Sequence, residues 1–435
     1  MFSAAEGRAF RPSLFLYAGR VRIRSGFPKP AAGRACAAAR RGASPRRDGL
    51  PGTGAADRQP PAGNRTPADE KMQGGLAKTA GNPYNKGITI VKREYAMKYL
   101  MGRRGFALKV MEKAVPEPGP GQALVRVFGC GVCGTDLHFL RVCDDWTALG
   151  HEISGEVAAV GSGVRAVAVG DRVVVEDVGA CGRCAACQNG KPELCTDMLT
   201  LDGQSGMGEY LVVPESMLVQ CGGLKPLEAC FVEPLTVCVH AVQATQLPPC
   251  GTLAVWGLGP LGLMSICAAR CFGAGRIVAV ASKRGTARNL HRSQLAMELG
   301  ADAVLYSDDS DFKAQLDALG GRIDAALVTS PPATLPAAVE TVSYGGRVVP
   351  IGIDLGGGSR VTLDVDHLIL QKKTIAPVLS EPALQFPLSV ELLRRGVVPV
   401  DRLLTHQVRL TDTEGLQRIF REDPTVIKVI VTPED

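Results

Sequence analysis

The sequence is poor in aromatic residues and histidine, and it lacks the long uninterrupted apolar run that a membrane-spanning helix requires. Aromatic residues make up 5% of the 435 residues, and there are six histidines. Prolines and glycines interrupt the longest uncharged stretch, residues 234–269, at Pro248, Pro249, Gly251 and Gly257. A helix long enough to cross a bilayer needs about 20 consecutive, mostly apolar residues. We therefore expect no membrane partner.

Acidic residues are scarce at the amino end of the chain. Residues 1–96 contain 18 Lys and Arg against 6 Asp and Glu, a net charge of +12, and Glu6 is the one acid in the first 47 residues. Residues 97–435 contain 31 basic against 37 acidic residues, a net charge of −6. A nucleic-acid binder keeps its positive charge on the folded part of the chain, where it neutralises phosphates. We therefore expect no nucleic-acid partner.

Residues 1–96 also lack a sustained hydrophobic period and are rich in Arg, Ala, Gly and Pro. This composition predicts a disordered basic extension. Two interpretations of the role of this extension, and of the compartment of the protein, stay open. In the first, Met97 or Met72 is the true start, the preceding stretch is a leader without a role, and the protein is cytoplasmic. In the second, residues 1–47 are a transit peptide and the protein belongs to an organelle matrix.

The fourteen cysteines are not spaced like a secreted disulfide framework, which indicates a reducing compartment. Four of them form the cluster Cys181-x2-Cys184-x2-Cys187-x7-Cys195. Four thiolates without another ligand type match a closed tetrahedral zinc site. The alternatives are a redox-active cysteine pair and an iron–sulfur cluster. Such a zinc would hold a loop that has no core of its own.

From residue 97 onward, short β-rich runs alternate with Pro and Gly, which predicts a small, strongly bent, β-barrel-like domain. Its loops carry Cys133 and, within twenty residues, His151 and Glu152, while Glu233 stands at an expected helix start. Thiolate, imidazole and carboxylate are ligand types that zinc accepts. Taken singly, each has an ordinary explanation: a small buried cysteine, a core histidine, or a carboxylate stabilised at a helix start.

The later part of the chain predicts a nucleotide-binding unit. A buried strand at residues 253–256 leads into Gly257-x-Gly259-x-x-Gly262, followed by a helical pattern to residue 270 and a second strand at residues 277–281. In this context the glycines make the tight turn, admit a pyrophosphate to the helix start, and let helix and strand pack. Residues 322–330, 345–353 and 366–378 are expected to hold further strands of the same parallel sheet, with helices between them.

The end of the second strand bears on the choice of nicotinamide cofactor. An NAD-binding unit places an acid there to bond the ribose 2′-hydroxyl, whereas this chain has Ala281-Ser282-Lys283-Arg284. An acid would repel a 2′-phosphate, and Ser, Lys and Arg can cradle one, so we predict NADP over NAD. In the alternative interpretation Lys283 and Arg284 form a solvated loop and NAD is accepted through its other contacts. The expected cofactor-binding residues are Gly257, Gly259, Pro260, Leu261, Gly262, Ser282, Lys283 and Arg284.

Together, and in this order, these motifs resemble those of the zinc-dependent medium-chain dehydrogenase/reductase family, the alcohol and polyol dehydrogenases. The strings that carry the resemblance are Cys133-Gly134-Thr135-Asp136-Leu137-His138 and Gly150-His151-Glu152. The resemblance covers residues 97–435 and implies an α/β fold. A GroES-like catalytic domain would be built from residues 97–247 and a returning segment, 376–435, and a Rossmann domain from residues 248–375. It also implies an active site in the cleft between the domains and a homo-oligomer, a dimer or tetramer.

The resemblance further implies two zinc ions per chain and a role for each motif residue. A catalytic zinc would be bound by Cys133 and His151, with Glu152 and Glu233 as acidic ligands, and a structural zinc by the four-cysteine cluster. An acid at position 233, where classical alcohol dehydrogenases have cysteine, points to polyols and related secondary alcohols. Thr135 and His138 match a proton relay, and Asp136 matches the carboxylate that orients a ligand imidazole, that of His151.

We therefore expect a zinc-dependent oxidoreductase that transfers a hydride from a secondary hydroxyl of a polyol, sugar or amino alcohol, a small-molecule substrate, to NAD(P). The alternatives are an enzyme like L-threonine 3-dehydrogenase, because the two branches share the Gly-Thr-Asp-Leu-His string, and a catalytically silent scaffold that binds zinc and a nucleotide. An intact relay argues against the scaffold. A zinc-free quinone reductase of the same fold is disfavoured, because such an enzyme would need none of the metal ligands.

The segment of residues 139–150 is short for this family and carries two acids, Asp144 and Asp145. Since this loop helps to wall the substrate pocket in the family, the acids are candidates for binding an amine or several hydroxyls of the substrate. The alternative is that they are exposed acids on a surface turn.

Overall fold

The structure, a computed structural model, describes residues 96–433. The expected basic extension of residues 1–96 and the transit peptide expected in residues 1–47 therefore lie outside the described residues, apart from Ala96. Within residues 96–433, no helix combines the length and apolar character needed to cross a bilayer.

The strands of a mainly antiparallel unit come from the first part of the described chain and from its carboxyl end, where residues 404–409 pair parallel with residues 428–432. They are β1 (Ala96–Arg103), β2 (Ala107–Ala114), β3 (Gln122–Gly131), β4 (Thr147–Ala148), β5 (Glu152–Val160), β6 (Arg172–Val175), β7 (Val178–Gly179), β8 (Leu199–Thr200), β9 (Tyr210–Pro214), β10 (Leu218–Gln220), β17 (Leu404–Arg409) and β18 (Lys428–Thr432). One sheet has the order β10-β6-β5-β3-β18-β17, with β9 also paired to β3, and a smaller sheet has the order β2-β1-β4. Two register shifts between β3 and β5 bend the larger sheet.

The strand β18, near the carboxyl end of the chain, lies beside the loop that follows β3. It pairs antiparallel with β3, with Ile430 opposite Gly131, and the N–H of Val132 donates to the carbonyl of Val429 at 2.9 Å. Residues from the end of the chain therefore lie next to residues 131–133.

A second, six-stranded sheet is parallel throughout. Its strands are β11 (Thr252–Trp256), β12 (Arg276–Ala281), β13 (Ala303–Tyr306), β14 (Ala325–Val328), β15 (Arg347–Pro350) and β16 (Thr374–Ile375). Their order, β13-β12-β11-β14-β15-β16, is that of a doubly wound dinucleotide-binding sheet. The order in which strands are added to the sheet reverses between β11 and β14, and ligands bind in the crevice at the carboxyl ends of the strands at such a point.

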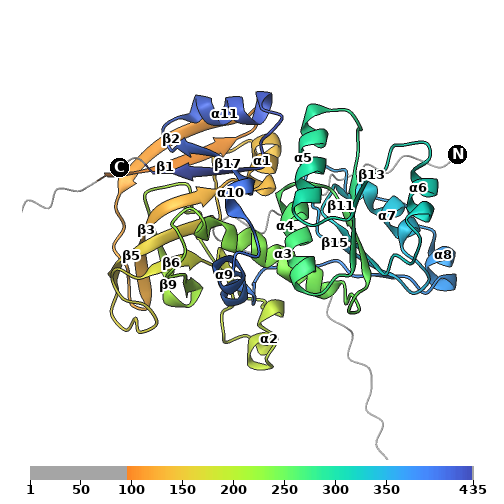
Figure 1. Ribbon diagram of the computed structural model, residues 1–435. Coiled ribbons are helices and arrows are strands. Elements are labelled where there is room, and N and C mark those ends of the chain that lie inside the picture. Colours follow the sequence, from red (N-terminus) through yellow and green to blue (C-terminus); the bar gives the residue numbers. More distant parts are fainter. Residues whose placement is uncertain (1–95, 434–435) are drawn as a thin grey trace, which may run out of the picture. The chain divides into compact units, whose positions relative to one another are not determined.

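Helices cover both faces of the parallel sheet. They are α3 (Val232–Ala244), α4 (Pro260–Cys271), α5 (Ala287–Glu298), α6 (Phe312–Ala318), α7 (Leu335–Thr341) and α8 (Val365–Leu370). Because side chains alternate along a strand, Leu253 and Val255 pack in the core under α3, α4 and α5, while Ala254 and Trp256 pack in the core under α6 and α7. Figure 1 shows these two groups of helices on opposite faces of the sheet.

The remaining helices belong to the antiparallel part. They are α1 (Gly134–Val142), α2 (Ala185–Gln188), α9 (Phe386–Arg394), α10 (Val400–Leu403) and α11 (Thr413–Glu422). The helix α3 packs against both α4 and α9, so it connects the core of the parallel sheet with the returning segment. The expected combination of a bent antiparallel β unit and a doubly wound parallel sheet is confirmed.

Candidate active site

The residues expected to bind the catalytic metal lie at two neighbouring strand ends. Cys133 is the N-cap residue of α1, shortly after β3, and His151 immediately precedes β5. In the antiparallel pairing of β3 with β5, Gly131 lies opposite Glu152, so the register brings the two loops together. One ligand atom each of Cys133, His151 and Glu152 lies within 4.8 Å of the other two.

Asp136 fixes the backbone of both loops. Its two carboxylate oxygens accept hydrogen bonds from the N–H groups of Cys133 (2.9 Å) and Gly150 (2.8 Å), and its side chain is buried. The expected hydrogen bond from the imidazole of His151 to Asp136 is not formed in this structure. Each oxygen of Asp136 accepts from a backbone N–H group, and Nδ1 of His151 is buried without a hydrogen-bond partner. Asp136 therefore positions the metal ligands through their backbone.

Glu152 has a buried cationic partner that the sequence motifs did not reveal. Lys428, the first residue of β18, forms an ion pair with Glu152, and the two side chains are 2% and 1% exposed. The Nζ of Lys428 also donates to the carbonyl of Val132 at 3.3 Å. Burial lowers the pKa of Lys428, but the negative groups around it, Glu152 first and then Cys133 and Glu233, together outweigh burial and raise that pKa above its ordinary value. Glu152 thus already has a charge partner within the chain.

Glu233 lies in a separate group of carboxylates. It stands in the first turn of α3, and one carboxylate oxygen each of Glu233, Asp177 and Glu381 lies within 4.8 Å of the others. Burial raises the pKa of Glu233 well above its ordinary value and that of Glu381 to about 8, and the charge of Asp177 adds to both shifts. Asp177 and Glu381 belong to no motif, so the sequence analysis missed them.

His151 faces both groups of acidic ligands. Burial lowers the pKa of His151, but the negative charges of Cys133, Asp136 and Glu233 outweigh burial and raise it well above the ordinary value. A thiolate, an imidazole with an orphaned ring nitrogen, and a carboxylate meet within bonding range of a common point. This donor set fits a zinc ion. Glu152 is the acid of the set, and the charge of Glu233 acts on His151 from the neighbouring group.

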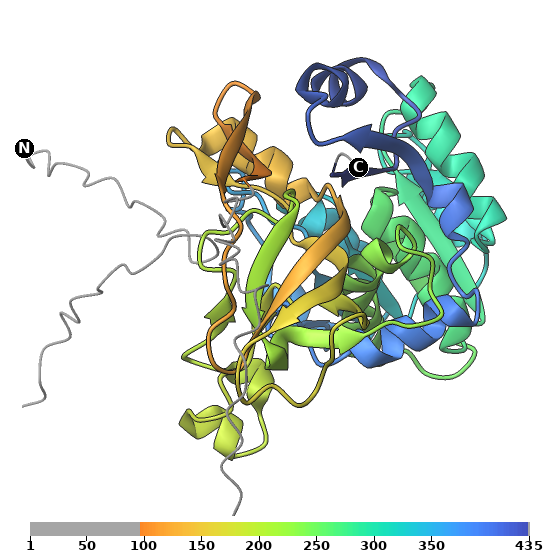
Figure 2. The ribbon, with the colours of Figure 1, turned by 90° about the vertical axis from the view of Figure 1, so that its left-hand side faces the viewer.

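The four-cysteine cluster forms a lobe around α2, which extends away from the sheets in both ribbon views (Figures 1 and 2). Its sulfur atoms all lie within 4.8 Å of one another, and Sγ of Cys184 lies 3.5 Å from Sγ of Cys187 and 3.8 Å from that of Cys195. These separations exceed a disulfide bond of about 2.05 Å. They match the separation of about 3.8 Å that tetrahedral zinc–sulfur bonds of about 2.3 Å impose.

The backbone of the lobe favours thiolates. The N–H groups of Arg183 and Cys184 donate to Sγ of Cys181 at 3.5 and 3.3 Å. Backbone N–H groups of Cys187 and Thr196 lower the pKa of Cys184 to about 5. Such N–H···S bonds stabilise the charged form in which cysteine binds metal, so the lobe fits a closed zinc site.

One pocket connects the metal donors with the glycine-rich turn. Thr135 and His138 line it, and Oγ1 of Thr135 lies 3.7 Å from Sγ of Cys133. Burial lowers the pKa of His138, which keeps its ring neutral near pH 7. Two predicted metal ligands, Cys133 and Glu152, therefore share a cavity with both relay residues and with Gly259 of the glycine turn. Its lining also includes Gly134, Glu152, Gly259, Pro260, Leu261, Thr329, Pro331, Ile351, Gly352, Ile353 and Lys428.

The three glycines after β11 have different surroundings. Gly257 has a φ of +94°, and a side chain there would press on Ser330. A Cβ at Gly262 would overlap the carbonyl oxygen of Gly257, whereas a Cβ at Gly259 would meet nothing within 4 Å. The carbonyl of Gly257 is held by Oγ1 of Thr329 at 3.0 Å. Neighbouring atoms therefore pack tightly against the turn at Gly257 and Gly262. The space beside Gly259 is open, so a ligand can approach the backbone there.

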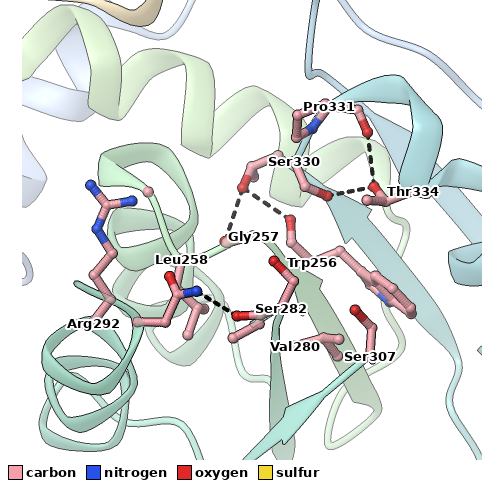
Figure 3. A pocket seen from close by; sticks show the side chains of 14 residues that line it. Trp256, Gly257, Leu258, Val280, Ser282, Arg292, Ser307, Ser330, Pro331 and Thr334 are labelled. Atoms are coloured by element: carbon pink, nitrogen blue, oxygen red, sulfur yellow. Dashed lines mark hydrogen bonds between the residues drawn. The ribbon is translucent and has the colours of Figure 1, made fainter. Parts of the chain in front are cut away.

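A second pocket continues from this turn along the end of β12 (Figure 3). Gly259, Thr329 and Pro331 line both pockets. In Figure 3, Arg292 and Leu258 lie on one side and Ser330 and Thr334 on the other. The complete lining is Trp256, Gly257, Leu258, Gly259, Val280, Ala281, Ser282, Asn289, Arg292, Ser307, Thr329, Ser330, Pro331 and Thr334.

Only one of the three polar residues expected to read a 2′-phosphate lines this pocket, namely Ser282. The guanidinium of Arg284 is bound to Asp309, with Nε 3.0 Å from its carboxylate, and stacks on Tyr306 at 4.2 Å. The N–H of Lys283 donates to Asp308 at 2.9 Å. The guanidinium of Arg284 and the backbone of Lys283 are therefore held by the acids after β13.

Arg292 is a cofactor-site residue that the sequence analysis missed. It lines the second pocket from α5, its Nε is buried without a hydrogen-bond partner, and Nη2 donates to the carbonyl of Val426 at 3.0 Å. Burial lowers the pKa of Arg292 to about 10, and the nearby Arg288 adds to this shift. An amphipathic period that places residue 292 on the strand side of its helix was the available signal.

The acids of the loop before His151 do not reach the pocket. Asp144 and Asp145 are exposed, and Asp144 forms an ion pair with Arg104 at 3.1 Å. Neither residue lines either pocket. Their assignment as surface acids on a turn therefore agrees with the structure.

Comparisons with known proteins agree with this site. Residues 119–223 match the family model "Alcohol dehydrogenase GroES-like domain", and residues 260–394 match "Zinc-binding dehydrogenase". Sorbitol dehydrogenase of Bacillus subtilis is 31% identical over 75% of this chain and 94% of its own length. L-threonine 3-dehydrogenase of Pyrococcus horikoshii is 32% identical over 70% and 89%, and (R,R)-butanediol dehydrogenase of Bacillus subtilis is 32% identical over 73% and 94%.

Solved structures show the same fold with cofactor bound. An alcohol dehydrogenase from Escherichia coli CFT073 complexed with NADH matches with a TM-score of 0.70 and 25% identity, over 78% of this chain and 99% of its own. A zinc-binding dehydrogenase from Sinorhizobium meliloti bound to NADP matches with a TM-score of 0.69 and 27% identity, over 78% and 100%. The donor set, the glycine turn and these matches together show that the chain belongs to the zinc-dependent medium-chain dehydrogenase/reductase family, whose members are NAD(P)-dependent oxidoreductases.

Proposed function

We propose that this protein is a zinc-dependent dehydrogenase that oxidises a secondary hydroxyl of a polyol, sugar or amino alcohol and prefers NADP. The observation that carries the proposal is the shared pocket. Cys133, Glu152 and Thr135 line it on one side, and Gly259 and Pro260 line it on the other. A hydride donor next to the metal site and a nicotinamide extending from the glycine turn would therefore meet in one cavity.

Each residue of the site has a task in this reaction. Cys133 and His151, with Glu152 and Glu233 as candidate acidic ligands, would bind a catalytic zinc, and the four cysteines of the α2 lobe a structural one. Bound zinc supplies a Lewis acid that lowers the pKa of a substrate hydroxyl. Thr135 lines the cavity and can take the hydroxyl proton. The neutral ring of His138 can accept that proton further out, because burial depresses its pKa.

Three features of the second pocket support NADP. Its lining contains no Asp or Glu, Ala281 stands where NAD-binding units place an acid, and the lining includes Arg292, whose buried Nε has no hydrogen-bond partner. The test is Ala281→Asp, which should swing the ratio of kcat/KM from NADP toward NAD. An unchanged ratio would show that the end of β12 does not read the 2′-phosphate. The proposal assigns the reading to Ser282 and Arg292, because Arg284 is engaged by Asp309.

The relatives make oxidation of L-threonine the second candidate function. Metal analysis and a substrate screen distinguish the candidates. We expect two zinc ions per chain and reduction of NADP⁺ by sorbitol or butane-2,3-diol. Faster turnover of L-threonine than of any polyol would favour the second candidate, and one zinc without turnover of any alcohol would indicate a scaffold.

We also propose a homo-oligomer. The strand β16 is an edge of the parallel sheet, and the neighbouring helix α8 exposes Val365, Ile369 and Leu370. An edge strand beside exposed apolar side chains favours pairing with a second copy. Light scattering at several protein concentrations tests this, and a monomer at all of them would contradict it.

A further inference from the structure

Apolar side chains make up much of the lining of the pocket that connects the metal donors with the glycine turn. They are Val132, Pro260, Leu261, Pro331, Ile351, Ile353 and Leu355. The cavity has a volume of about 300 Å³, which is at the lower end of the range for small-molecule sites. The nicotinamide ring of the proposed cofactor has to share this volume, so the space left for a substrate is small.

The loop after β15 builds a fixed apolar wall on this pocket. Ile351 packs against the core that contains residues of α3 and α4, and Leu355 packs against the core of the mainly antiparallel unit. The wall is therefore anchored at both ends. Ile353, between them, lines the pocket and is 51% exposed. An apolar group of a ligand that covers Ile353 would be removed from water together with it, which is favourable.

The acid of the same loop does not contribute to the wall. Asp354 lies between Ile353 and Leu355 in the sequence, but it does not line the pocket. Its Oδ1 accepts a hydrogen bond from the N–H of Gly356 at 2.7 Å, and a Cβ at Gly358 would collide with its other carboxylate oxygen. The carboxylate thus folds back on its own loop, and the loop presents apolar side chains to the pocket.

The polar side chains of the lining are already engaged. Its two charged residues, Glu152 and Lys428, form an ion pair with each other. Thr329 donates its hydroxyl proton to the backbone carbonyls of Trp256 and Gly257, at 3.1 and 3.0 Å. The remaining polar side chains are the proposed thiolate ligand and the two relay residues. Within residues 96–433, the lining therefore offers no side chain reserved for further hydroxyls or for charged groups of a substrate.

This lining discriminates between substrates by the groups that flank the reacting hydroxyl. A flanking hydroxyl that leaves water without gaining a partner costs free energy, and an unpaired ammonium or carboxylate group costs more. A flanking methyl or methylene group gains free energy when it is buried against the wall. The pocket therefore favours alkyl groups beside the carbinol carbon.

We propose that the substrate is a short secondary alcohol with alkyl groups beside its reacting hydroxyl, and that Ile353 and Leu355 select it by packing against one of these groups. The proposal rests on the proposed dehydrogenase function and narrows its substrate class to the members rich in alkyl groups. The reacting hydroxyl faces the metal donors while the alkyl group lies on the wall. Ile353 is then a specificity-determining residue.

The experiment compares matched substrates that differ only in their terminal groups. The pairs are meso-butane-2,3-diol with erythritol, and racemic butane-2,3-diol with racemic threitol. Each pair has the same four carbons and the same central hydroxyls, and the methyl groups of the diol are hydroxymethyl groups in the tetrol. The zinc-loaded full chain is used with the better of NADP⁺ and NAD⁺. We expect kcat/KM to be about 10- to 100-fold higher for the diol in at least one pair, and higher for that diol than for L-threonine.

A substitution in the wall locates the effect. Ile353→Thr places a hydroxyl on the wall and should reduce the ratio of diol to tetrol at least severalfold. The matched control is Val169→Thr, which changes an exposed apolar residue that lines neither pocket and should leave the ratio as in the wild type. The ratio is taken within one protein sample, so a partly unfolded variant does not distort it.

Binding is measured separately by ligand-observed NMR on the chain saturated with the reduced cofactor, which accepts no hydride. Equal or lower kcat/KM for the diol in both pairs would overturn the proposal, as would faster turnover of L-threonine than of either diol. A ratio that Ile353→Thr leaves unchanged, or that Val169→Thr changes equally, would overturn the role of Ile353. Failure of the dehydrogenase function would be seen on its own, as no reduction of either cofactor by any alcohol, and the NMR affinities would then still show whether the pocket favours the diols.

Discussion

Two glycines of the nucleotide turn differ at the residue scale, although both belong to the same motif. Gly262 lies against the carbonyl of Gly257, whereas Gly259 faces open space. We predict that Gly262→Ala lowers the free energy of unfolding by about 1–3 kcal/mol through overpacking. Gly259→Ala should leave that free energy close to the wild-type value but raise the Kd of NADP⁺, since the methyl group enters the ligand space.

Chemical denaturation and fluorescence titration of the cofactor measure the two effects. Equal destabilisation by both substitutions would contradict this division between a packing glycine and a ligand-facing glycine. Normal cofactor binding by Gly259→Ala would contradict it as well.

The ion pair of Glu152 and Lys428 also makes a prediction about single residues. Both side chains are almost fully buried, so removing one leaves the other charge without a partner. We predict that Lys428→Met destabilises the protein by about 3–5 kcal/mol. The double variant Glu152→Gln, Lys428→Met should recover part of this loss, because no charge is then stranded.

Urea denaturation after removal of metal by a chelator measures this double-mutant cycle, so that metal affinity does not enter the comparison. Additive losses in the double variant would mean that the two groups do not interact in the protein. That outcome would also remove the reason to regard Glu152 as charge-balanced.

At the scale of elements, the α2 lobe is held by its cysteines more than by packing. The helix α2 has four residues and none of them is buried. We predict that Cys187→Ser removes one zinc ion per chain and exposes the lobe to trypsin at Arg183, while the remainder of the chain stays folded. Metal analysis and limited proteolysis measure this.

The matched control for the lobe is Cys250→Ser, which changes an exposed free cysteine outside the cluster. It should retain the full zinc content and the wild-type cleavage pattern. A Cys187→Ser variant that keeps both zinc ions, or one that resists trypsin in the lobe, would show that packing holds this segment.

Whether a site residue could be predicted from the sequence depends on whether it lies in a local string or is brought to the site by the pairing and packing of distant elements. The glycine turn, the four-cysteine lobe and the pair Cys133 and His151 are local strings, each contained in a loop next to a strand, and their chemistry follows from residue type and spacing. Lys428, Asp177 and Glu381 have no such string. They reach the site through the register of β18 on β3, the pairing of β6 with β5, and the packing of α9 on α3.

Two contacts bear on predictions that rest on local strings. The resemblance assigns Asp136 to the imidazole of His151, whereas its carboxylate accepts hydrogen bonds from the backbone N–H groups of Cys133 and Gly150. The place of Lys283 and Arg284 at the end of β12 and their charge predict a phosphate contact, whereas the backbone N–H of Lys283 and the guanidinium of Arg284 bind Asp308 and Asp309 after β13. Competing acids from a neighbouring strand are invisible until the strand order is known.

At the scale of the whole molecule, β1 (Ala96–Arg103) opens the mainly antiparallel unit. The first strand β1 is part of that unit, because it pairs with β2 along its full length, Leu100 is fully buried, and the N–H of Leu100 donates to the carbonyl of Met207 at 2.8 Å. A cut before β1 therefore removes none of these contacts, whereas a cut after β1 removes the centre of its sheet.

We predict that a chain beginning at Met97 keeps the zinc content, the cofactor affinity and the kcat/KM of the full chain, and that a chain beginning at Gly105 loses cooperative unfolding. The chain beginning at Gly105 lacks Met97 and Leu100, which are both buried. Deleting a buried side chain of this size from a core costs on the order of 2–5 kcal/mol. The loss of both is a large part of the free energy of unfolding of a typical domain. Thermal unfolding, metal analysis and steady-state kinetics on the three chains measure this. Reduced kcat/KM in the chain from Met97 would assign residues 1–96 a part in catalysis, and a stable chain from Gly105 would show that β1 is dispensable to the fold.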